Sequence, residues 1–462
     1  MSTKIYPIGI QNFEKIRNDG YFYIDKTALM YQMVKTGSYY FLSRPRRFGK
    51  SLLISTLEAY FQGKKELFEG LAVEKLEKDW IKHPILHLDL NIEKYDTPES
   101  LDKILNDNLE YWESQYGTRP SETSFSLRFA GIIQRACEKT GQRVVILVDE
   151  YDKPMLQAIG NEELQKQFRN TLKPFYGALK TKDGYIKFAL LTGVTKFGKV
   201  SVFSDLNNLD DISMWNEYVE ICGVSEREIH ENLEAELHEF AAARGITYDK
   251  LCEDLRECYD GYHFTHNSIG MYNPFSLLNA FKRKEFGSYW FETGTPTYLV
   301  KLLKKHHYDL ERMAHEETDV QVLNSIDSES TNPIPVIYQS GYLTIKGYDE
   351  EFGMYRLGFP NREVEEGFIR FLLPFYANVN KVESPFEIQK FVREVRSGDY
   401  NSFFRRLQSF FADTTYEVIR DQELHYENVL FIVFKLLGFY TTVEYHTSEG
   451  RIDLVLQTDK FI

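Results

Sequence analysis

The 462-residue sequence predicts an α/β fold whose core is a parallel β-sheet. In residues 1–200, short apolar runs alternate with longer segments that have the periodicity of helices. One apolar run leads into a loop that ends in Gly-Lys-Ser, and another ends in two adjacent carboxylates. Short, continuous apolar runs are typical of strands buried on both faces, as in a sheet covered by helices.

Strands and helices alternate along this part of the chain, which is the pattern of a parallel sheet with crossover helices. The expected strands are residues 39–42, 85–90, 144–148 and 188–191. The expected helices are residues 26–35, 52–62, 100–112, 125–140 and 162–180.

The rest of the chain has a different pattern, and its length suits roughly three domains in all. Helices are expected at 226–243, 248–259 and 273–284, the last beginning with an Asn-Pro pair. The apolar segments 336–338, 343–345 and 354–357 predict a small β element, and a winged-helix-like domain would fit them. Further helices are expected at 362–376, 386–412 and 426–437, followed by strands at 439–445 and 451–456. We therefore expect domains at 1–215, 216–380 and 381–462.

The loop at residues 43–51, Ser-Arg-Pro-Arg-Arg-Phe-Gly-Lys-Ser, has the composition of a phosphate-binding loop between a strand and a helix. Backbone N–H groups and the positive end of the helix favour phosphate binding at such a turn. Lys50 would reach the β- and γ-phosphates of ATP, and the Ser51 hydroxyl would bind Mg²⁺. The residues expected to bind the nucleotide are Arg46, Arg47, Phe48, Gly49, Lys50, Ser51 and Leu52.

Two positions depart from the usual loop. Arg44 stands five residues before Gly49, where glycine is usual, and arginine adopts a positive φ at a higher cost. Pro45 has no N–H to donate to a phosphate. The arginines that follow would compensate in part, because guanidinium groups bind phosphate well. The alternative interpretation is a basic strand-to-helix turn in which Gly-Lys-Ser occurs by chance.

A second motif, residues 144–150, has the Val-Val-Ile-Leu-Val-Asp-Glu pattern of a Walker B strand. Asp149 would hold Mg²⁺ through water, and Glu150 would polarise the attacking water. Both motifs end at the carboxyl ends of strands, where open α/β sheets bind their ligands. A buried strand stopped by acidic surface residues is the alternative, but the preceding Gly-Lys-Ser loop favours a P-loop NTPase of the ASCE type.

Three further signals are weaker. Thr192 ends an apolar strand, where a hydroxyl would either act as a sensor of the γ-phosphate or the lytic water, or only cap the strand. Residues 196–199 contain lysines, but the pattern does not single out one of them. Glu427 on a helix and Asp453 on a strand match the first two metal-binding acids of many nucleases, although their spacing also fits surface residues.

The formal net charge of −14 argues against a nucleic-acid-binding surface that covers the whole chain, while a local basic patch stays open. Four cysteines without metal-ligand spacing are expected to be free thiols, namely Cys137, Cys222, Cys252 and Cys258. The N-terminus lacks the apolar core of a signal peptide, and no apolar run approaches the ~18 residues of a membrane span. We therefore expect a cytoplasmic protein without a membrane partner.

With these motifs, the chain resembles the bacterial AAA-ATPase-like proteins that pair an ATPase with a C-terminal PD-(D/E)xK nuclease-like domain. The resemblance covers nearly the whole chain and rests on residues 6–9, 23–27, 44–51, 149–154, 206–209, 259–264 and 292–296. It implies that Arg44-Pro45 is the family's own variant of the loop. It also implies ATP binding by Gly49, Lys50 and Ser51, Walker B acids at Asp149 and Glu150, and nuclease acids at Glu427 and Asp453.

The family's nuclease-like domain carries an acid-x-Lys strand that would follow Ile462. We therefore expect an incomplete restriction-endonuclease-like fragment without nuclease activity of its own. The expected function is ATP hydrolysis that drives conformational change in a DNA- or partner-directed activity. The alternatives are a nucleotide-dependent binding switch with little turnover, or a Mg²⁺-dependent DNA nuclease if the acid-x-Lys strand is supplied. The expected ligands are ATP and Mg²⁺, and the partners considered are DNA, a second copy of the chain or an unidentified protein.

Overall fold

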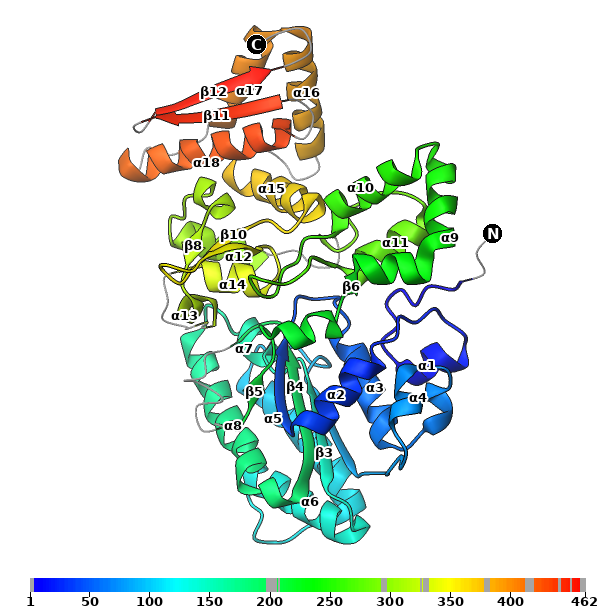
Figure 1. Ribbon diagram of the computed structural model, residues 1–462. Coiled ribbons are helices and arrows are strands. Elements are labelled where there is room, and N and C mark those ends of the chain that lie inside the picture. Colours follow the sequence, from blue (N-terminus) through cyan, green and yellow to red (C-terminus); the bar gives the residue numbers. More distant parts are fainter. Residues whose placement is uncertain are drawn as a thin grey trace.

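The computed structural model describes residues 4–196, 206, 208–291, 297–324, 326, 332–377, 383–411, 419–438, 442–448 and 451–457. Its parts follow one another along one direction (Figure 1). A parallel sheet with its helices lies at one end, a region of helices and small sheets lies in the middle, and helices with a β-hairpin lie at the other end.

The core is a five-stranded sheet in the order β2-β3-β4-β1-β5, and all its neighbouring strands are parallel. β4 lies between β1 and β3, so it separates the strand before the Gly-Lys-Ser loop from the strand that ends in two acids. This arrangement is the ASCE-type P-loop sheet and confirms the predicted fold class. The strands are β1 (Tyr39–Ser43), β2 (Ile85–Asp89), β3 (Val144–Asp149), β4 (Ile186–Gly193) and β5 (Asp210–Asp211).

The helices that cover this sheet lie close to the predicted segments. They are α2 (Thr27–Thr36), α3 (Lys50–Phe61), α5 (Pro98–Tyr116), α6 (Phe125–Thr140) and α8 (Glu162–Thr181). α6 and α8 pack against each other, with the stacked rings of Phe129 and Phe175 4.5 Å apart. The short helices α1 (Phe13–Asn18), α4 (Ala72–Leu76) and α7 (Lys153–Gln157) have no predicted counterpart, because so few residues show no clear periodicity.

The middle region begins with the three predicted helices, α9 (Glu226–Arg244), α10 (Tyr248–Tyr259) and α11 (Pro274–Arg283). A capping box formed by Ser225 and Glu228 starts α9, and the Asn273 side chain accepts the first N–H groups of α11. These helices share a hydrophobic cluster with the paired strands β6 (Val224–Ser225) and β7 (Met271–Tyr272), and it is distinct from the main core.

A winged-helix-like unit follows, but the first of its predicted strands is wrong. Residues 336–338 lie in a helix, α14, because a short apolar run suits a buried helix as well as a strand. Proline at the first turn favours the helix, since no N–H is needed there. The unit consists of α12 (Thr297–Lys305), α13 (Val320–Leu323), α14 (Ile334–Gln339) and a three-stranded sheet, β8 (Glu317–Thr318), β10 (Met354–Gly358) and β9 (Thr344–Asp349).

The C-terminal part contains α15 (Arg362–Tyr376), α16 (Ser384–Ser397), α17 (Tyr400–Phe411), α18 (Ile419–Gly438) and a hairpin of β11 (Thr442–Ser448) with β12 (Arg451–Gln457). The single helix predicted over 386–412 is wrong, because Gly398 adopts a left-handed conformation, with a φ of 74°, and ends α16. Asn428 on α18 accepts the N–H of Leu310, which connects this part to the winged unit.

Buried apolar residues from all three expected domains belong to one cluster, which extends from Phe13 to Leu437. The domain boundaries therefore stay a prediction. All four cysteines are free. Among the residues that the structure describes, none of the helices combines the length and the apolar composition that a membrane span requires.

Gly261 provides a test of the middle region's packing. Its φ is +94°, and a Cβ added there would overlap the carbonyl oxygen of Pro360. We expect Gly261→Ala to lower the free energy of unfolding by about 2–3 kcal/mol, from strain and steric conflict together. Gly245→Ala is the matched control, because Gly245 has a φ of +66° but open space around the added Cβ, so only about 1 kcal/mol should be lost. Equal losses in chemical denaturation would contradict this account.

Candidate functional site

The loop between β1 and α3 turns sharply before the helix begins. Arg47 and Gly49 adopt left-handed conformations, with φ of 65° and 100°, and α3 starts directly afterwards at Lys50. Arg44 is not among the residues with positive φ. The backbone at this position therefore does not need glycine, and the departure from the usual loop has no conformational cost there.

Arg44 has a structural role. Its side chain is 1% exposed and donates hydrogen bonds to the carbonyl oxygens of Ser213, at 2.7 Å, and Tyr218, at 3.1 Å. Its guanidinium lies 3.9 Å from the centre of the Phe264 ring. Burial lowers the pKa of Arg44 to about 10. Arg44 thus joins the loop to two segments that follow the sheet, and it does not line the cavity beside the loop.

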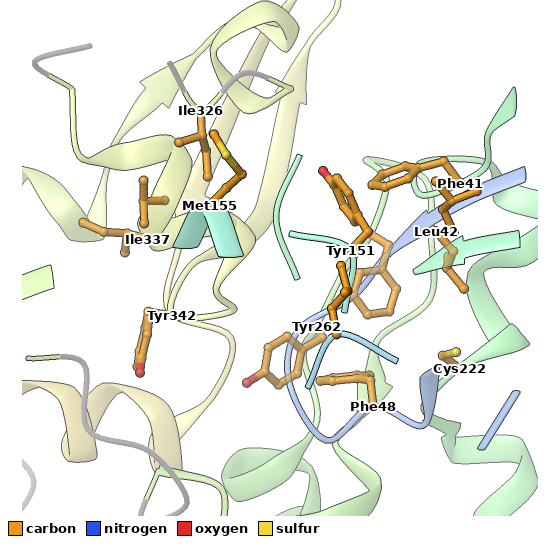
Figure 2. Packing of buried hydrophobic residues seen from close by; sticks show 14 of the residues in the cluster. Phe41, Leu42, Phe48, Tyr151, Met155, Cys222, Tyr262, Ile326, Ile337 and Tyr342 are labelled. Carbon is orange, nitrogen blue, oxygen red and sulfur yellow. The ribbon is translucent and has the colours of Figure 1, made fainter. Parts of the chain in front are cut away.

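Phe48 is also directed into the protein. Its ring is 1% exposed and makes edge-to-face contacts with Tyr262 and Phe264, at centroid distances of 4.8 and 5.5 Å. Figure 2 shows Phe48 beside Tyr262, with Cys222 nearby. The carbonyl oxygen of Phe48 accepts the N–H of Gly223 at 2.9 Å. Phe48 therefore does not line the large cavity beside the loop, and it lines a smaller neighbouring cavity instead.

Arg46 and Arg47 lie between these two anchors and line a large cavity. The carbonyl oxygen of Arg46 accepts a hydrogen bond from the indole N–H of Trp290 at 2.9 Å, and its guanidinium donates to the Tyr342 hydroxyl at 3.3 Å. The guanidinium of Arg47 lies 5.0 Å from the centre of the Phe275 ring. The loop is therefore in contact with the middle region along most of its length.

The cavity measures about 920 Å³ and lies at the carboxyl edge of the sheet. Gly49, Lys50, Ser51, Leu52 and Glu150 line it, as predicted residues of the two motifs. Its other walls include residues 7–11 from the N-terminal segment and 274, 275 and 278 from α11. Sequence patterns cannot identify these walls, because they come from segments that are distant in the chain.

Lys50 and Glu150 face each other in this cavity. The ammonium of Lys50 donates to the carbonyl oxygens of Arg44 and Pro45, at 3.1 and 3.3 Å, and lies 3.7 Å from a carboxylate oxygen of Glu150. Glu150 directly follows β3 and adopts a left-handed conformation, with a φ of 54°. The pairing brings the two predicted motifs together.

Asp149 and Thr192 are connected below the cavity. Asp149 is 4% exposed and accepts a hydrogen bond from the Thr192 hydroxyl at 2.6 Å. Thr192 is fully buried and does not line the cavity, and its hydroxyl contacts Asp149. An orienting role for Thr192 follows more directly from this geometry than a sensor role.

Asp152 has no assigned role in the sequence analysis, although it lies within the segment 149–154. Its carboxylate is fully buried and accepts hydrogen bonds from the N–H groups of Val194 and Thr195 and from the Thr195 hydroxyl. Burial, with a smaller contribution from the charge of Glu150, raises the pKa of Asp152 to about 7. The only sequence signal for this residue is that it follows the two acids closely.

The remaining predicted positions are partly described. Lys196 pairs with Asp211 at 2.9 Å, whereas residues 197–199 lie outside the described residues, as do Asn207 and residues 292–296 of the family segments. Glu427 is exposed on α18, and the backbone of Asp453 in β12 pairs with His446 of β11.

Comparisons with known proteins give matches to two family models, to a relative and to a solved structure. Residues 7–203 match the family model described as "Predicted AAA-ATPase", and residues 421–462 match the PD-(D/E)XK nuclease superfamily. An uncharacterised protein encoded in the vnfD 5′ region of Azotobacter chroococcum mcd 1 is 35% identical over 470 residues, which cover 99% of this chain and 87% of that protein. The structure of the Aeropyrum pernix ORC2 protein in ADPNP-ADP complexes aligns with a TM-score of 0.25 and 10% identity, over 72% of this chain and 87% of that chain. A TM-score of this size supports no inference about function.

The buried position of Arg44 predicts a large effect on stability. Arg44→Ala should lower the free energy of unfolding by about 3 kcal/mol, because it leaves two buried carbonyl groups without their donor. Arg47→Ala, in the exposed part of the loop, should cost at most about 1 kcal/mol. Chemical denaturation of both variants gives the comparison, and a loss for Arg44→Ala no larger than for Arg47→Ala would contradict the anchoring role.

Glu363 predicts a dependence of stability on pH. It accepts the backbone N–H of Trp290 at 2.7 Å, and burial raises its pKa to about 7 from an ordinary value of 4.5. Because the folded-state pKa is raised, the stability that protonated Glu363 contributes is complete below pH 4.5 and is lost as the pH rises through about 7. Glu363→Gln cannot ionise, so its melting temperature should fall less than that of the wild type between about pH 5 and about pH 8. Glu350→Gln, at an exposed position, should follow the wild type, and identical curves for all three proteins would contradict the prediction.

Proposed function

The chain belongs to the predicted AAA-ATPase family, and we propose that it binds ATP with Mg²⁺ in the large cavity and hydrolyses the ATP. The observation that carries this proposal is the pairing of Lys50 with Glu150 in that cavity, 3.7 Å apart. A cation at the start of a helix and a carboxylate opposite it are two of the groups that phosphoryl transfer to water requires.

The phosphates would bind at the N-terminal end of α3. There the helix dipole and the backbone N–H groups favour anions, and Lys50 would exchange its loop carbonyl partners for phosphate oxygens. Arg46 and Arg47 add positive charge on the same cavity wall. Glu150 would orient and deprotonate the attacking water as a general base.

The two motifs also contain oxygen donors of the kind that Mg²⁺ prefers. Ser51 lies on the cavity wall, and Asp149 is buried with its carboxylate oriented by Thr192. A hydroxyl and a carboxylate are hard oxygen ligands, so these residues fit the ion. When bound, the ion would neutralise charge that develops on the β- and γ-phosphate oxygens.

The base of the nucleotide has a suitable position next to the loop. A second cavity, of about 110 Å³, shares Gly49, Leu52, Pro274 and Leu278 with the large one. Its further lining is mainly apolar and comes from the N-terminal segment, from α3 and from residues 221–224. A flat, largely apolar base suits such a cavity, with the triphosphate extending toward Lys50.

ATP turnover would drive a change in the middle region, because the loop is in contact with it through Arg44, Arg46 and Phe48. The turn between β9 and β10 contains Glu350 and Glu351 next to Phe352, which is 72% exposed, and it follows Asp349 at the end of β9. An acidic tip does not favour contact with DNA phosphates, so a protein partner suits this hairpin better.

A nucleotide-dependent binding switch with little turnover is the second candidate. The contacts of Arg44 with Phe264 and of Arg46 with Trp290 favour this candidate, because they would let a bound nucleotide affect the middle region without hydrolysis. The two candidate functions differ in how fast ATP is hydrolysed, but both require Lys50 for nucleotide binding.

Two variants test the proposal. Lys50→Ala should weaken ATP binding by about tenfold or more, since contacts to a charged group contribute about 1.5–3 kcal/mol. Glu150→Gln should keep its affinity for ATP and lose about 10²–10⁴-fold in kcat, because only the general base is removed. Calorimetric titration and phosphate release measure the two effects, with Lys64→Ala as a control at an exposed ion pair. Unchanged turnover in Glu150→Gln would contradict the assigned base, whereas Lys50-dependent binding without wild-type turnover would favour the switch.

A further inference from the structure

Asp152 connects the turn after β3 to the end of β4. One of its carboxylate oxygens, Oδ2, accepts three hydrogen bonds, from the N–H of Val194 at 3.1 Å, the N–H of Thr195 at 2.6 Å and the hydroxyl of Thr195 at 2.5 Å. The side chain is 0% exposed. A buried carboxylate with this many donors fixes the position of its own backbone strongly.

Two neighbours strengthen the same connection. The N–H of Tyr151 donates to the carbonyl oxygen of Thr192 at 3.0 Å, and its hydroxyl donates to that of Thr195 at 2.8 Å. Gly193 allows the close approach, because a Cβ there would lie 2.5 Å from the Oδ1 atom of Asp152 and 2.7 Å from the ring of Tyr151. Residues 151 and 152 are therefore held against residues 192–195 from several sides.

The residue just before this connection is Glu150. Its left-handed conformation, with a φ of 54°, is unfavourable for a non-glycine residue and persists only where the surroundings determine it. The N–H of Lys153 donates to the carbonyl oxygen of Glu150 at 3.0 Å, which closes the turn. The conformation of this turn directs the Glu150 side chain into the cavity, where its carboxylate lies 3.7 Å from Lys50.

We propose that Asp152 is a positioning residue, which holds Glu150 in the orientation required for hydrolysis by tying the turn at residues 150–152 to the end of β4. The inference rests on the proposed function, because it assigns Asp152 a role in the same reaction. Asp152 lies behind the turn and does not line the cavity, so it acts through Glu150 and not on the nucleotide. Hydrogen bonds also connect this turn, which carries Glu150, to Thr192, which orients Asp149.

Asp152→Ala should lower kcat by about 10²-fold, as expected when a catalytic group is misplaced by about 1 Å, with the affinity for ATP nearly unchanged. Asp152→Asn, which keeps an acceptor for Thr195, should recover part of this loss. Gly193→Ala should reduce kcat in the same way without removing a charge, and it serves as the second variant if Asp152→Ala does not fold.

The deciding measurement is the double variant. If Asp152 acts through Glu150, Glu150→Gln combined with Asp152→Ala should be no slower than Glu150→Gln alone, since residues that act as a unit are not additive. Glu77→Ala is the matched control, because Glu77 is also buried and also accepts one hydroxyl and two backbone N–H groups, far from the cavity. It should lose stability and keep its kcat.

The outcomes separate this inference from the proposed function. Suppose that the wild type hydrolyses ATP. If the Asp152 variants then keep its kcat, or if the losses in the double variant are additive, the role of Asp152 is overturned and the proposed hydrolysis stands. Absence of turnover in the wild type would contradict the proposed hydrolysis, and the positioning role would fail with it.

Discussion

The burial of the Arg44 guanidinium is the interaction on which the shape of the phosphate loop depends. Most loops of this type use glycine to bring the backbone close to the ligand. In this chain, Arg44 and Phe48 instead hold the two ends of the loop by contacts with Ser213, Tyr218, Tyr262 and Phe264. These two large side chains face the middle region, and Arg46 and Arg47 between them line the cavity. Tertiary contacts therefore define a loop geometry that local conformational preference would not.

This arrangement makes the nucleotide site and the middle region parts of one structure. The carbonyl oxygen of Arg46 is bound by Trp290, whose own backbone is held by Glu363 of α15. A shift of the loop by a bound phosphate would have to be accommodated along this series of contacts. Because protein interiors are closely packed, such a shift moves the contacting side chains rather than compressing them. The P-loop sheet is thus connected by direct contacts to the helices that follow it.

The sequence predicted the sheet and its covering helices well, because continuous apolar runs such as residues 144–148 have few alternatives once a helix period is excluded. It failed where local signals were ambiguous, as at residues 336–338, or where one glycine ended a helix, as at Gly398. At the site, the closeness of Lys50 and Glu150 could be predicted because both positions follow from the two motifs, while their roles stay a prediction. The orientations of Arg44, Phe48 and Thr192 could not, since they depend on partners such as Ser213 and Tyr262 that are distant along the chain. Asp152 could not be predicted for the same reason, because its hydrogen-bond partners, Val194 and Thr195, lie in the segment that follows β4.

The walls of the cavity pack in two different hydrophobic clusters. Phe48 of the phosphate loop, Tyr262, Trp290 and Tyr342 belong to the main cluster, which also contains residues of the sheet and the C-terminal helices. The opposite wall of the cavity is formed by Pro274, Phe275 and Leu278 of α11, whose helix packs in the separate cluster with α9 and α10. Displacing α9–α11 against the sheet would separate Arg47 from Phe275 and the Asn273 amide from the carbonyl oxygen of Arg46, and it would break the Lys26–Glu228 ion pair. Displacing the loop side would disrupt Arg44 and the packing of Phe48 together. The two walls of the cavity therefore belong to different hydrophobic clusters, and a bound nucleotide would lie between them.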